Sequence, residues 1–324
     1  MIILTDSIPF AQDCFPHKRD WRKRGLPDLD AAAQVLANEL FTAEAVMVSE
    51  LPGEGHWDYL FAVEHASRSQ YDALAELAGS GAELPGRVLC CAAEGARFHG
   101  FKGRSWQACR GNIHLSAYVT PDMAVNGGAA GFIVASVVAA LQAAESVDLH
   151  GERPAIKWVN DLLIGGAKVG GVLARLQTQR DTVKGAVVGI GLNVERRPQV
   201  ERDPYVPAVA SLADFARHGE RCRHADVFAH LAERLGENIG RLLRGEYDAL
   251  LEIYRQHSAV IGRWVTILEE RQDAPADVIA SGRVNAIGRA LELHVEGHAR
   301  PVTKGRVILE PEKRPPGDGT EKTS

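Results

Sequence analysis

The sequence has few cysteines, and their arrangement excludes several classes of protein. It contains no CxxC pair and no other spacing typical of a metal site. An odd number of cysteines also argues against a disulfide framework. The neighbours Cys90 and Cys91 lie in an apolar segment, where we interpret them as small buried hydrophobic residues. The five cysteines are Cys14, Cys90, Cys91, Cys109 and Cys222.

Long apolar runs and an excess of positive charge are also missing. The longest apolar run, Gly131–Leu141, is well short of the roughly 20 residues that a membrane-spanning helix needs. The N-terminus lacks the basic region and apolar core of a signal peptide. A net charge of −5 gives no global basic field for nucleic acid. We therefore expect a cytoplasmic protein with no membrane and no nucleic-acid partner.

The first part of the chain offers little pattern. Prolines 9, 16 and 27 interrupt residues 1–27, which we expect to be irregular. The basic run His17–Arg24 fits either a nucleic-acid-binding arm or, in this acidic chain, a solvated segment. Asp28 or Asp30 could cap a helix that ends near Phe41. We find no pair of helices after it that reads as helix-turn-helix.

The rest of the chain alternates between helical and strand patterns. Its 324 residues, 45% of them hydrophobic, suffice for one sizeable core and a smaller unit. Helices are predicted at 69–78 (ended by Gly79), 125–144, 227–242 (capped by Asp226) and 248–257. From Ile261 the pattern changes to short strands, including one at 300–303. The tail 310–324 has the composition of a disordered segment.

The densest pattern lies in residues 155–194. Four apolar runs separated by short turns predict an antiparallel meander. Lys157 stands alone in the first run, and a buried ammonium must be paired, neutralised or used on a ligand. Glycines at 170, 171, 189 and 191 allow something to approach the backbone closely. Each piece taken alone also fits an ordinary strand or hairpin turn.

Three motifs in this region occur in a specific order. They are Lys157-Trp158-Val159-Asn160-Asp161, Lys168-Val169-Gly170-Gly171-Val172-Leu173 and Gly189-Ile190-Gly191-Leu192-Asn193-Val194. Together they resemble the catalytic domain of biotin protein ligases, and a weaker resemblance extends from Val63 to Leu309. The DNA-binding repressor domain of some such ligases has no counterpart in the pattern.

This resemblance implies an architecture. The fold class is α+β, with a mixed or antiparallel sheet packed by helices and a small C-terminal SH3-like β-barrel. The implied boundaries are an N-terminal extension at 1–58, a catalytic domain at 59–257, the SH3-like domain at 258–310 and a tail at 311–324.

The resemblance also implies roles for the central motifs. The lysine matching Lys157 contacts the acid's carboxylate and the α-phosphate of ATP. Asn193 matches an asparagine of the nucleotide and metal region, where we also place Asn160 and Lys168. Gly170 and Gly171 line the acyl pocket. Asp161 is a candidate to orient or receive the proton of the acceptor amine. No residue is assigned as a metal ligand.

Residues upstream complete the expected acid site. Ser67-Arg68-Ser69 takes the place of a Ser-Thr-Asn turn that binds the head group of the acid, although the serines could simply cap a helix. The segment with Gly111, Asn112 and His114 matches a strand that backs the acyl pocket. Gly103-Arg104-Ser105-Trp106 also matches closely, and we expect Gly100, Lys102, Arg104 and Trp106 to contact substrate.

The loop before that match departs from the family. Where biotin ligases carry Gly-Arg-Gly-Arg-Arg-Gly over the acyl-adenylate, this chain has Phe98-His99-Gly100-Phe101-Lys102-Gly103. Cations in this loop neutralise phosphate charge and hold the mixed anhydride. With Phe101 replacing one of them, we expect the intermediate to be held less firmly and a more apolar acid to be tolerated.

Three functions remain open from the sequence. The first is an ATP-dependent, Mg²⁺-requiring ligase that adenylates biotin and transfers it to a lysine of a carrier-protein domain. The second is a ligase for another small-molecule acid such as lipoate or octanoate, although no Arg-Arg-x-Ser-Gly-Gly-Gly segment typical of lipoate ligases is found. The third is a non-catalytic binding homologue. A homodimer is compatible with each of them.

Overall fold

The computed structural model describes residues 1–16, 19–51, 55–124, 128–200, 204–217, 222–271 and 274–310. The chain divides into two compact units, Met1–Ser258 and Ala259–Ser324. Three predicted regions lie wholly or partly outside the described residues: His17-Lys18 of the basic run, residues 125–127 at the start of the helix predicted at 125–144, and the tail from 311 onward.

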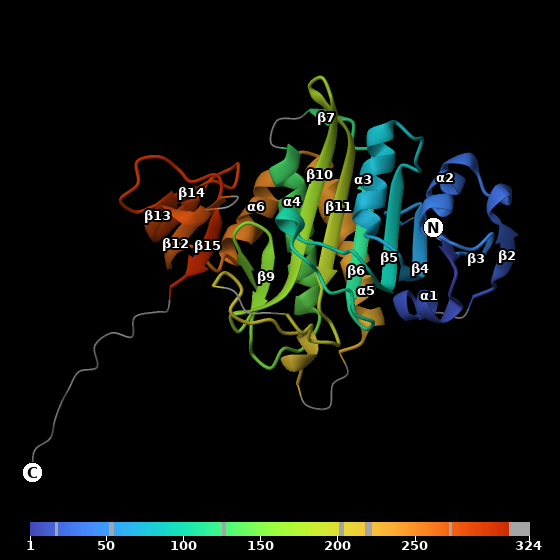
Figure 1. The fold of residues 1–324 in the computed structure, drawn as a ribbon, viewed down its shortest axis with the longest axis horizontal. Coiled ribbons are helices and arrows are strands. Elements are labelled where there is room, and N and C mark those ends of the chain that lie inside the picture. Colours follow the sequence, from blue (N-terminus) through green and yellow to red (C-terminus); the bar gives the residue numbers. More distant parts are fainter. Residues whose placement is uncertain are drawn as a thin grey trace, which may run out of the picture. The chain divides into compact units, whose positions relative to one another are not determined.

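The first unit is built on a sheet of eleven strands. Its order is β2-β3-β1-β4-β5-β6-β11-β10-β9-β8, with β7 paired to β11. The pairs β1–β4 and β4–β5 are parallel and the others are antiparallel, so the sheet is mixed, as expected. Figure 1 shows β2 and β3 at one side of this sheet and β9 toward the other. The strands are β1 (Ile2–Thr5), β2 (Arg22–Gly25), β3 (Ala45–Glu50), β4 (Tyr59–Ala66), β5 (Arg87–Gly95), β6 (Ile113–Val119), β7 (Met123–Ala124), β8 (Ala155–Lys157), β9 (Asp161–Ile164), β10 (Ala167–Gln179) and β11 (Thr182–Leu192).

Six α-helices accompany the sheet. They are α1 (Ile8–Cys14), α2 (Ala31–Leu40), α3 (Gln70–Ser80), α4 (Gly128–Glu145), α5 (His224–Leu243) and α6 (Tyr247–Gln256). Short 3-10 turns occur at Leu26–Asp28, Phe101–Gly103 and Leu212–Asp214.

The expectation that residues 1–27 are irregular is wrong. Ile2–Thr5 forms β1, which pairs antiparallel with β3 and parallel with β4. Ser7 accepts a hydrogen bond from the backbone of Phe10 and so caps α1. Pro9 falls in the first turn of that helix, where its missing N–H has no intrahelical partner to lose. The part of the basic run at Arg22–Arg24 belongs to strand β2.

Some of the predicted helix caps are present in the structure and others are not. Asp30 caps α2 through the Ala33 N–H at 3.0 Å, as expected. Helix α3 runs past Gly79 to Ser80, and the residue that follows it, Gly81, has the left-handed φ of +79° that favours glycine after a helix. Asp226 is not the cap of α5. That helix begins at His224, and Asp226 lies in its first turn, paired with Arg223 at 2.8 Å.

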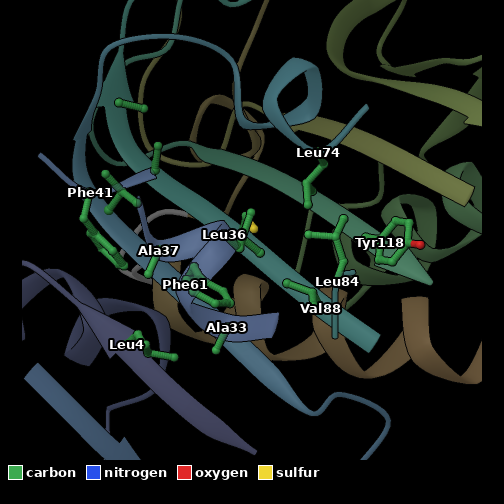
Figure 2. Packing of buried hydrophobic residues seen from close by; sticks show 14 of the residues in the cluster. Leu4, Ala33, Leu36, Ala37, Phe41, Phe61, Leu74, Leu84, Val88 and Tyr118 are labelled. Carbon is green, nitrogen blue, oxygen red and sulfur yellow. The ribbon is translucent and has the colours of Figure 1, made fainter. Parts of the chain in front are cut away.

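Alternate side chains of the sheet pack against different helices. Cys90 belongs to the cluster that α2 and α3 bury, whereas the sulfur of the next residue, Cys91, lies 3.5 Å from that of Cys14 in α1. Figure 2 shows residues of this cluster, among them Leu36 of α2, Leu74 of α3 and the sheet residue Phe61. Helices α2 and α3 therefore cover one face of this part of the sheet.

Helix α4 is the most apolar helix of the first unit. It is long and apolar enough to cross a membrane, but 72% of it is buried inside the protein. It packs on β10 and β11 and against α5, where Gly131 faces the Leu242 side chain. Its composition is that of a helix buried on several sides.

The second unit contains a four-stranded antiparallel sheet in the order β14-β13-β12-β15. This agrees with the expected small SH3-like domain. The segment predicted as a strand at 300–303 forms only one isolated bridge, between Leu293 and Val302. The strands are β12 (Trp264–Arg271), β13 (Ala274–Ile287), β14 (Leu293–Val295) and β15 (Arg306–Leu309).

Candidate active site

A cavity of about 710 Å³ opens in the first unit where β6, β10 and β11 meet the start of α3. The loop between β5 and β6 and the loops after β11 complete its wall. The cavity is lined by Ser69, Tyr71, Phe98–Phe101, Arg104–Gln107, His114–Ser116, Asn160, Asp161, Lys168, Gly171–Leu173, Gly189–Gly191, Asn193, Pro198–Val200, Val206 and Val209.

One end of the cavity carries a buried ion pair. The Nζ of Lys168 lies 2.6 Å from Oδ1 of Asp161, and both side chains are about four-fifths buried. Gly171 lies beside them, and a Cβ there would come within 3.4 Å of Asp161 and 3.5 Å of Lys168. Glycine thus leaves room for the pair, which forms a fixed polar corner in the wall.

Asn193 adds an unused acceptor to this end. Its side chain is 1% exposed, and its Nδ2 donates to the Ala210 carbonyl at 3.0 Å. Its Oδ1 is buried and has no hydrogen-bond partner among the described residues. The amide oxygen of Asn193 and the carboxylate of Asp161 both belong to residues that line the cavity, and together they are a donor set that fits Mg²⁺, which prefers oxygen ligands. These two residues could therefore hold the ion expected from the sequence.

Two residues of the first motif make contacts with the backbone. Lys157 is 6% exposed, and its Nζ donates to the carbonyl of Tyr205. Among the described residues, Lys157 is not part of the cavity wall. Asn160 does line the cavity, and its Nδ2 donates to the Val172 carbonyl, which ties the turn between β8 and β9 to β10.

Trp106 and His114 form a hydrogen-bonded pair in the opposite wall. The Nε1 of Trp106 donates to Nδ1 of His114 at 3.2 Å, and Nε2 of His114 lies 3.1 Å from the Cys109 carbonyl. These contacts select the neutral tautomer with its hydrogen on Nε2. Burial lowers the pKa of His114 to about 4, so the ring stays neutral at physiological pH. The indole fills the space beside Gly191, where a Cβ would come within 2.5 Å of it.

Several wall residues were not among the predicted site residues, and Tyr71, Phe98 and Ser116 are three of them. The Tyr71 ring lies over Gly189, where a Cβ would be 3.0 Å from the ring, and Phe98 stacks edge-on against His114 at 5.7 Å. Ser116 adds a hydroxyl beside them. The glycines at 189 and 191 were the available signal. They indicated a close approach, but the structure shows that the protein's own aromatic rings make it.

The three residues of the Ser67-Arg68-Ser69 turn point to different places, and only Ser69 lines the cavity. Ser69 lines the cavity and occupies the position before α3, where its side chain makes no capping hydrogen bond within the described residues. Ser67 is exposed and lies outside the cavity wall, so the structure does not bring it to the site. Arg68 points elsewhere, to Glu39 at 2.6 Å and Glu76 at 2.7 Å.

Four other predicted site residues lie outside the described wall of the cavity. Asn112 is fully buried, and its Oδ1 accepts from the backbone N–H groups of Val194 and Arg196, both at 3.0 Å. Gly111 has a φ of +88° and sits against Glu195. At Gly170 a Cβ would lie 2.8 Å from the Gly191 carbonyl. Lys102 is exposed, with a φ of +58°.

The sequence matches known proteins over this region. The model of the biotin/lipoate A/B protein ligase family matches residues 87–193. The biotin–[acetyl-CoA-carboxylase] ligase of Mycobacterium tuberculosis is 31% identical over 276 residues, which are 82% of this chain and 94% of that protein. The bifunctional ligase/repressor BirA of Bacillus subtilis is 32% identical over 157 residues, 48% of this chain and 46% of that protein. The match thus spans about half the length of that relative.

Solved structures share the fold. The biotin protein ligase of Aquifex aeolicus in complex with biotin and ATP has a TM-score of 0.59 at 17% identity, covering 78% of this chain and 99% of that one. A biotin protein ligase-like protein of unknown function from Silicibacter sp. TM1040 has a TM-score of 0.54 at 15% identity, covering 80% and 96%. These likenesses support the architecture, and the mycobacterial relative extends over most of both sequences. The chain belongs to the biotin protein ligase family.

Proposed function

We propose that the protein is an ATP-dependent, AMP-forming ligase that joins biotin to a lysine of a carrier-protein domain. The observation that carries the proposal is the cavity with two chemically different ends. At β9 and β10 the wall carries the Lys168–Asp161 pair, whereas toward β6 and β11 it carries the rings of Tyr71 and Trp106 with the hydroxyls of Ser69 and Ser116. Such a cavity suits an acid whose apolar chain ends in a carboxylate beside a nucleotide phosphate.

The first step forms the acyl-adenylate. A carboxylate oxygen of biotin attacks the α-phosphorus of ATP, and the bond to pyrophosphate breaks. Lys168 supplies positive charge for the phosphate oxygens from the cavity wall. Lys157, which donates to the 204–206 loop from behind it, supplies a second positive charge. Asn193 and Asp161 would hold Mg²⁺, which screens the charge of the phosphates when bound. The aromatic wall keeps water from the mixed anhydride.

The second step transfers the acyl group. The amine of a carrier lysine attacks the acyl carbon, an amide bond forms and AMP leaves. The amine must lose a proton, and the Asp161 carboxylate is placed at the polar end to accept a hydrogen bond from it. The ion pair with Lys168 at 2.6 Å fixes the orientation of that carboxylate.

Biotin fits the other end of the cavity better than an octanoyl chain. Ser69 and Ser116 are almost completely buried and line the cavity close to Tyr71. A hydroxyl both donates and accepts hydrogen bonds, so this end can satisfy the N–H and C=O groups of a ureido ring. An octanoyl chain would leave the two hydroxyls without partners, which is unfavourable in a buried site.

We propose that the macromolecular substrate is a cytoplasmic carrier domain. Nucleic acid has no part in the reaction, and a homodimer is compatible with it without being required. The acceptor lysine would enter in an extended conformation, as it must to reach the anhydride.

The test is a competition between acids. Purified protein, MgATP and a biotin carboxyl carrier domain are incubated with a mixture of biotin, lipoate and octanoate. The mass of the carrier domain is then measured by mass spectrometry. We expect the carrier to gain the mass of biotin less one water. A gain matching lipoate or octanoate would contradict the choice of acid, and no gain from any acid would contradict ligase activity.

A further inference from the structure

His99 is bound tightly although it stands where the family has an arginine. Its Nε2 lies 2.9 Å from each carboxylate oxygen of Asp72, and its Nδ1 lies 3.1 Å from the Gly100 carbonyl. Both ring nitrogens thus face acceptors, an arrangement that only the imidazolium can satisfy fully. The side chains of His99 and Asp72 are 29% and 34% exposed, so the pair is mostly shielded from water.

The two partners come from different elements beside the cavity, and of the two only His99 is among its described lining residues. Asp72 lies in the first turn of α3, directly after the wall residue Tyr71. His99 lies in the loop of residues 98–103, whose residues Phe98–Phe101 form the facing wall. The Tyr71 ring meets His99 edge-on at 6.3 Å, so an aromatic contact accompanies the ion pair. The contact joins the loop to the helix across the acid end of the cavity.

The loop is closed on itself by backbone bonds. Gly100 N–H donates to the Arg104 carbonyl at 2.7 Å, and Trp106 N–H donates to the Phe98 carbonyl at 3.0 Å. Its arginines also turn to backbone groups: Arg104 donates to the Phe101 carbonyl, and the preceding Arg97 donates to the Ser67 carbonyl. The bonds of Gly100, Trp106 and Arg104 shape the hairpin, whereas Arg97 ties its start to the segment before α3 and His99 ties its middle to α3 itself.

We propose that the Asp72–His99 ion pair is a latch that fixes the 98–103 loop against α3 before substrates bind. Both are positioning residues for the acyl-adenylate, a role that rests on the proposed function. A loop that is ordered by folding loses less conformational entropy when ligand binds. The latch thus offsets the cation that Phe101 has replaced in this loop.

The latch is sensitive to pH, with a definite sign. The Gly100 carbonyl and the Asp72 carboxylate raise the pKa of His99 above 6.5. Its contribution is therefore complete below pH 6.5 and is lost as the pH rises through the higher folded-state pKa. The other charged or titratable groups around it are Tyr71 on α3, Arg175 of β10, whose charge acts on Tyr71, and Arg97, Lys102 and Arg104 in or beside the loop.

Hydrogen–deuterium exchange of the ligand-free protein tests the latch without reference to activity. The measured peptide covers residues 98–104 in the wild type, Asp72→Asn and His99→Gln. We expect roughly threefold to tenfold faster exchange in both variants, the range for losing one partly shielded charge-assisted hydrogen bond. Glu76→Gln is the matched control, because Glu76 lies one turn further along α3 and pairs with Arg68.

A rescue variant separates the latch from a general effect on folding. His99→Arg keeps a cation opposite Asp72 at every pH. After correction for the intrinsic exchange rate, wild-type protection of 98–104 should fall between pH 6 and 8.5, whereas that of His99→Arg should not. Unchanged exchange in Asp72→Asn, or equal pH dependence of the two proteins, would overturn the latch.

The consequence for catalysis is measured separately. With biotin and MgATP but no carrier, Asp72→Asn should release AMP several times faster than wild type, because the adenylate escapes and hydrolyses. AMP release at the wild-type rate in Asp72→Asn with a loosened loop would overturn the positioning role. Hydrogen–deuterium exchange could show the latch in a wild-type protein that activates no acid. That result would contradict the proposed function and leave the latch supported.

Discussion

At the scale of single residues, the site depends on how two lysines are held away from water. Lys168 pairs with a carboxylate inside the cavity, whereas Lys157 donates to the Tyr205 carbonyl behind it. A buried ammonium needs such partners because desolvation alone would be very costly.

Replacing Lys157 by alanine should reduce pyrophosphate exchange at least about 100-fold, the scale for removing one preorganised donor from a reacting group. Lys184→Ala is the control, because Lys184 forms a surface pair with Asp122. Circular dichroism confirms that each variant is folded. If folded Lys157→Ala keeps pyrophosphate exchange near the wild-type level, Lys168 and not Lys157 supplies the charge for the reacting phosphate.

His114 should make the protein sensitive to acid. Its pKa falls from 6.5 in the unfolded chain to about 4 in the fold, because burial disfavours the charged ring. The neutral ring's contribution is complete above pH 6.5 and is lost as the pH falls toward 4, a change of about 3 kcal/mol.

The measurement is the free energy of unfolding in urea at several pH values between 7 and 4. The difference between wild type and His114→Gln should shrink as the pH falls, because glutamine does not titrate. A constant difference over this range would show that His114 is not a buried neutral base.

At the scale of elements, the β10–β11 hairpin carries glycines whose space is filled by rings from elsewhere. Trp106 and Tyr71 come from a loop and from α3, far from β11 in the sequence. The motif predicted that something approaches Gly189 and Gly191 closely. Which groups do so depends on tertiary packing, and no local pattern in the sequence records it.

Gly191→Ala should raise the KM for biotin roughly tenfold, since a Cβ 2.5 Å from Trp106 must push the indole into the cavity. Gly240→Ala is the control, because the nearest group to its Cβ is the flexible end of Arg244 at 3.3 Å. Steady-state kinetics of both variants decides the point. An unchanged KM in Gly191→Ala would mean that Trp106 does not shape the acid site.

Local chemistry predicted some elements well and others poorly. The 155–194 meander and the α2 cap were predictable because hairpins and caps join residues close in sequence. Strand β1 was missed because its four residues have no alternation of their own and are specified by β3 and β4 on either side. Lys157 was recognised as buried, but its partner, Tyr205, lies 48 residues away.

At the scale of the whole molecule, the N-terminal residues are part of the sheet that carries the site. Ile3 is fully buried between β3 and β4. Ile3→Ala should therefore lower the free energy of unfolding by about 2–5 kcal/mol, the range for large-to-small core changes. Val278→Ala, at a side chain 61% exposed, should change it by less than about 0.5 kcal/mol. Equal effects in urea titrations would contradict the place of β1.

The central claim is that this chain activates biotin with ATP in the described cavity. It is tested most directly by ATP–pyrophosphate exchange with the purified protein, Mg²⁺ and biotin, in the absence of any carrier protein. The proposed mechanism predicts exchange that depends on biotin, because formation of the adenylate is reversible and needs no acceptor. Absence of biotin-dependent exchange in folded protein would contradict the claim and leave a non-catalytic member of the family.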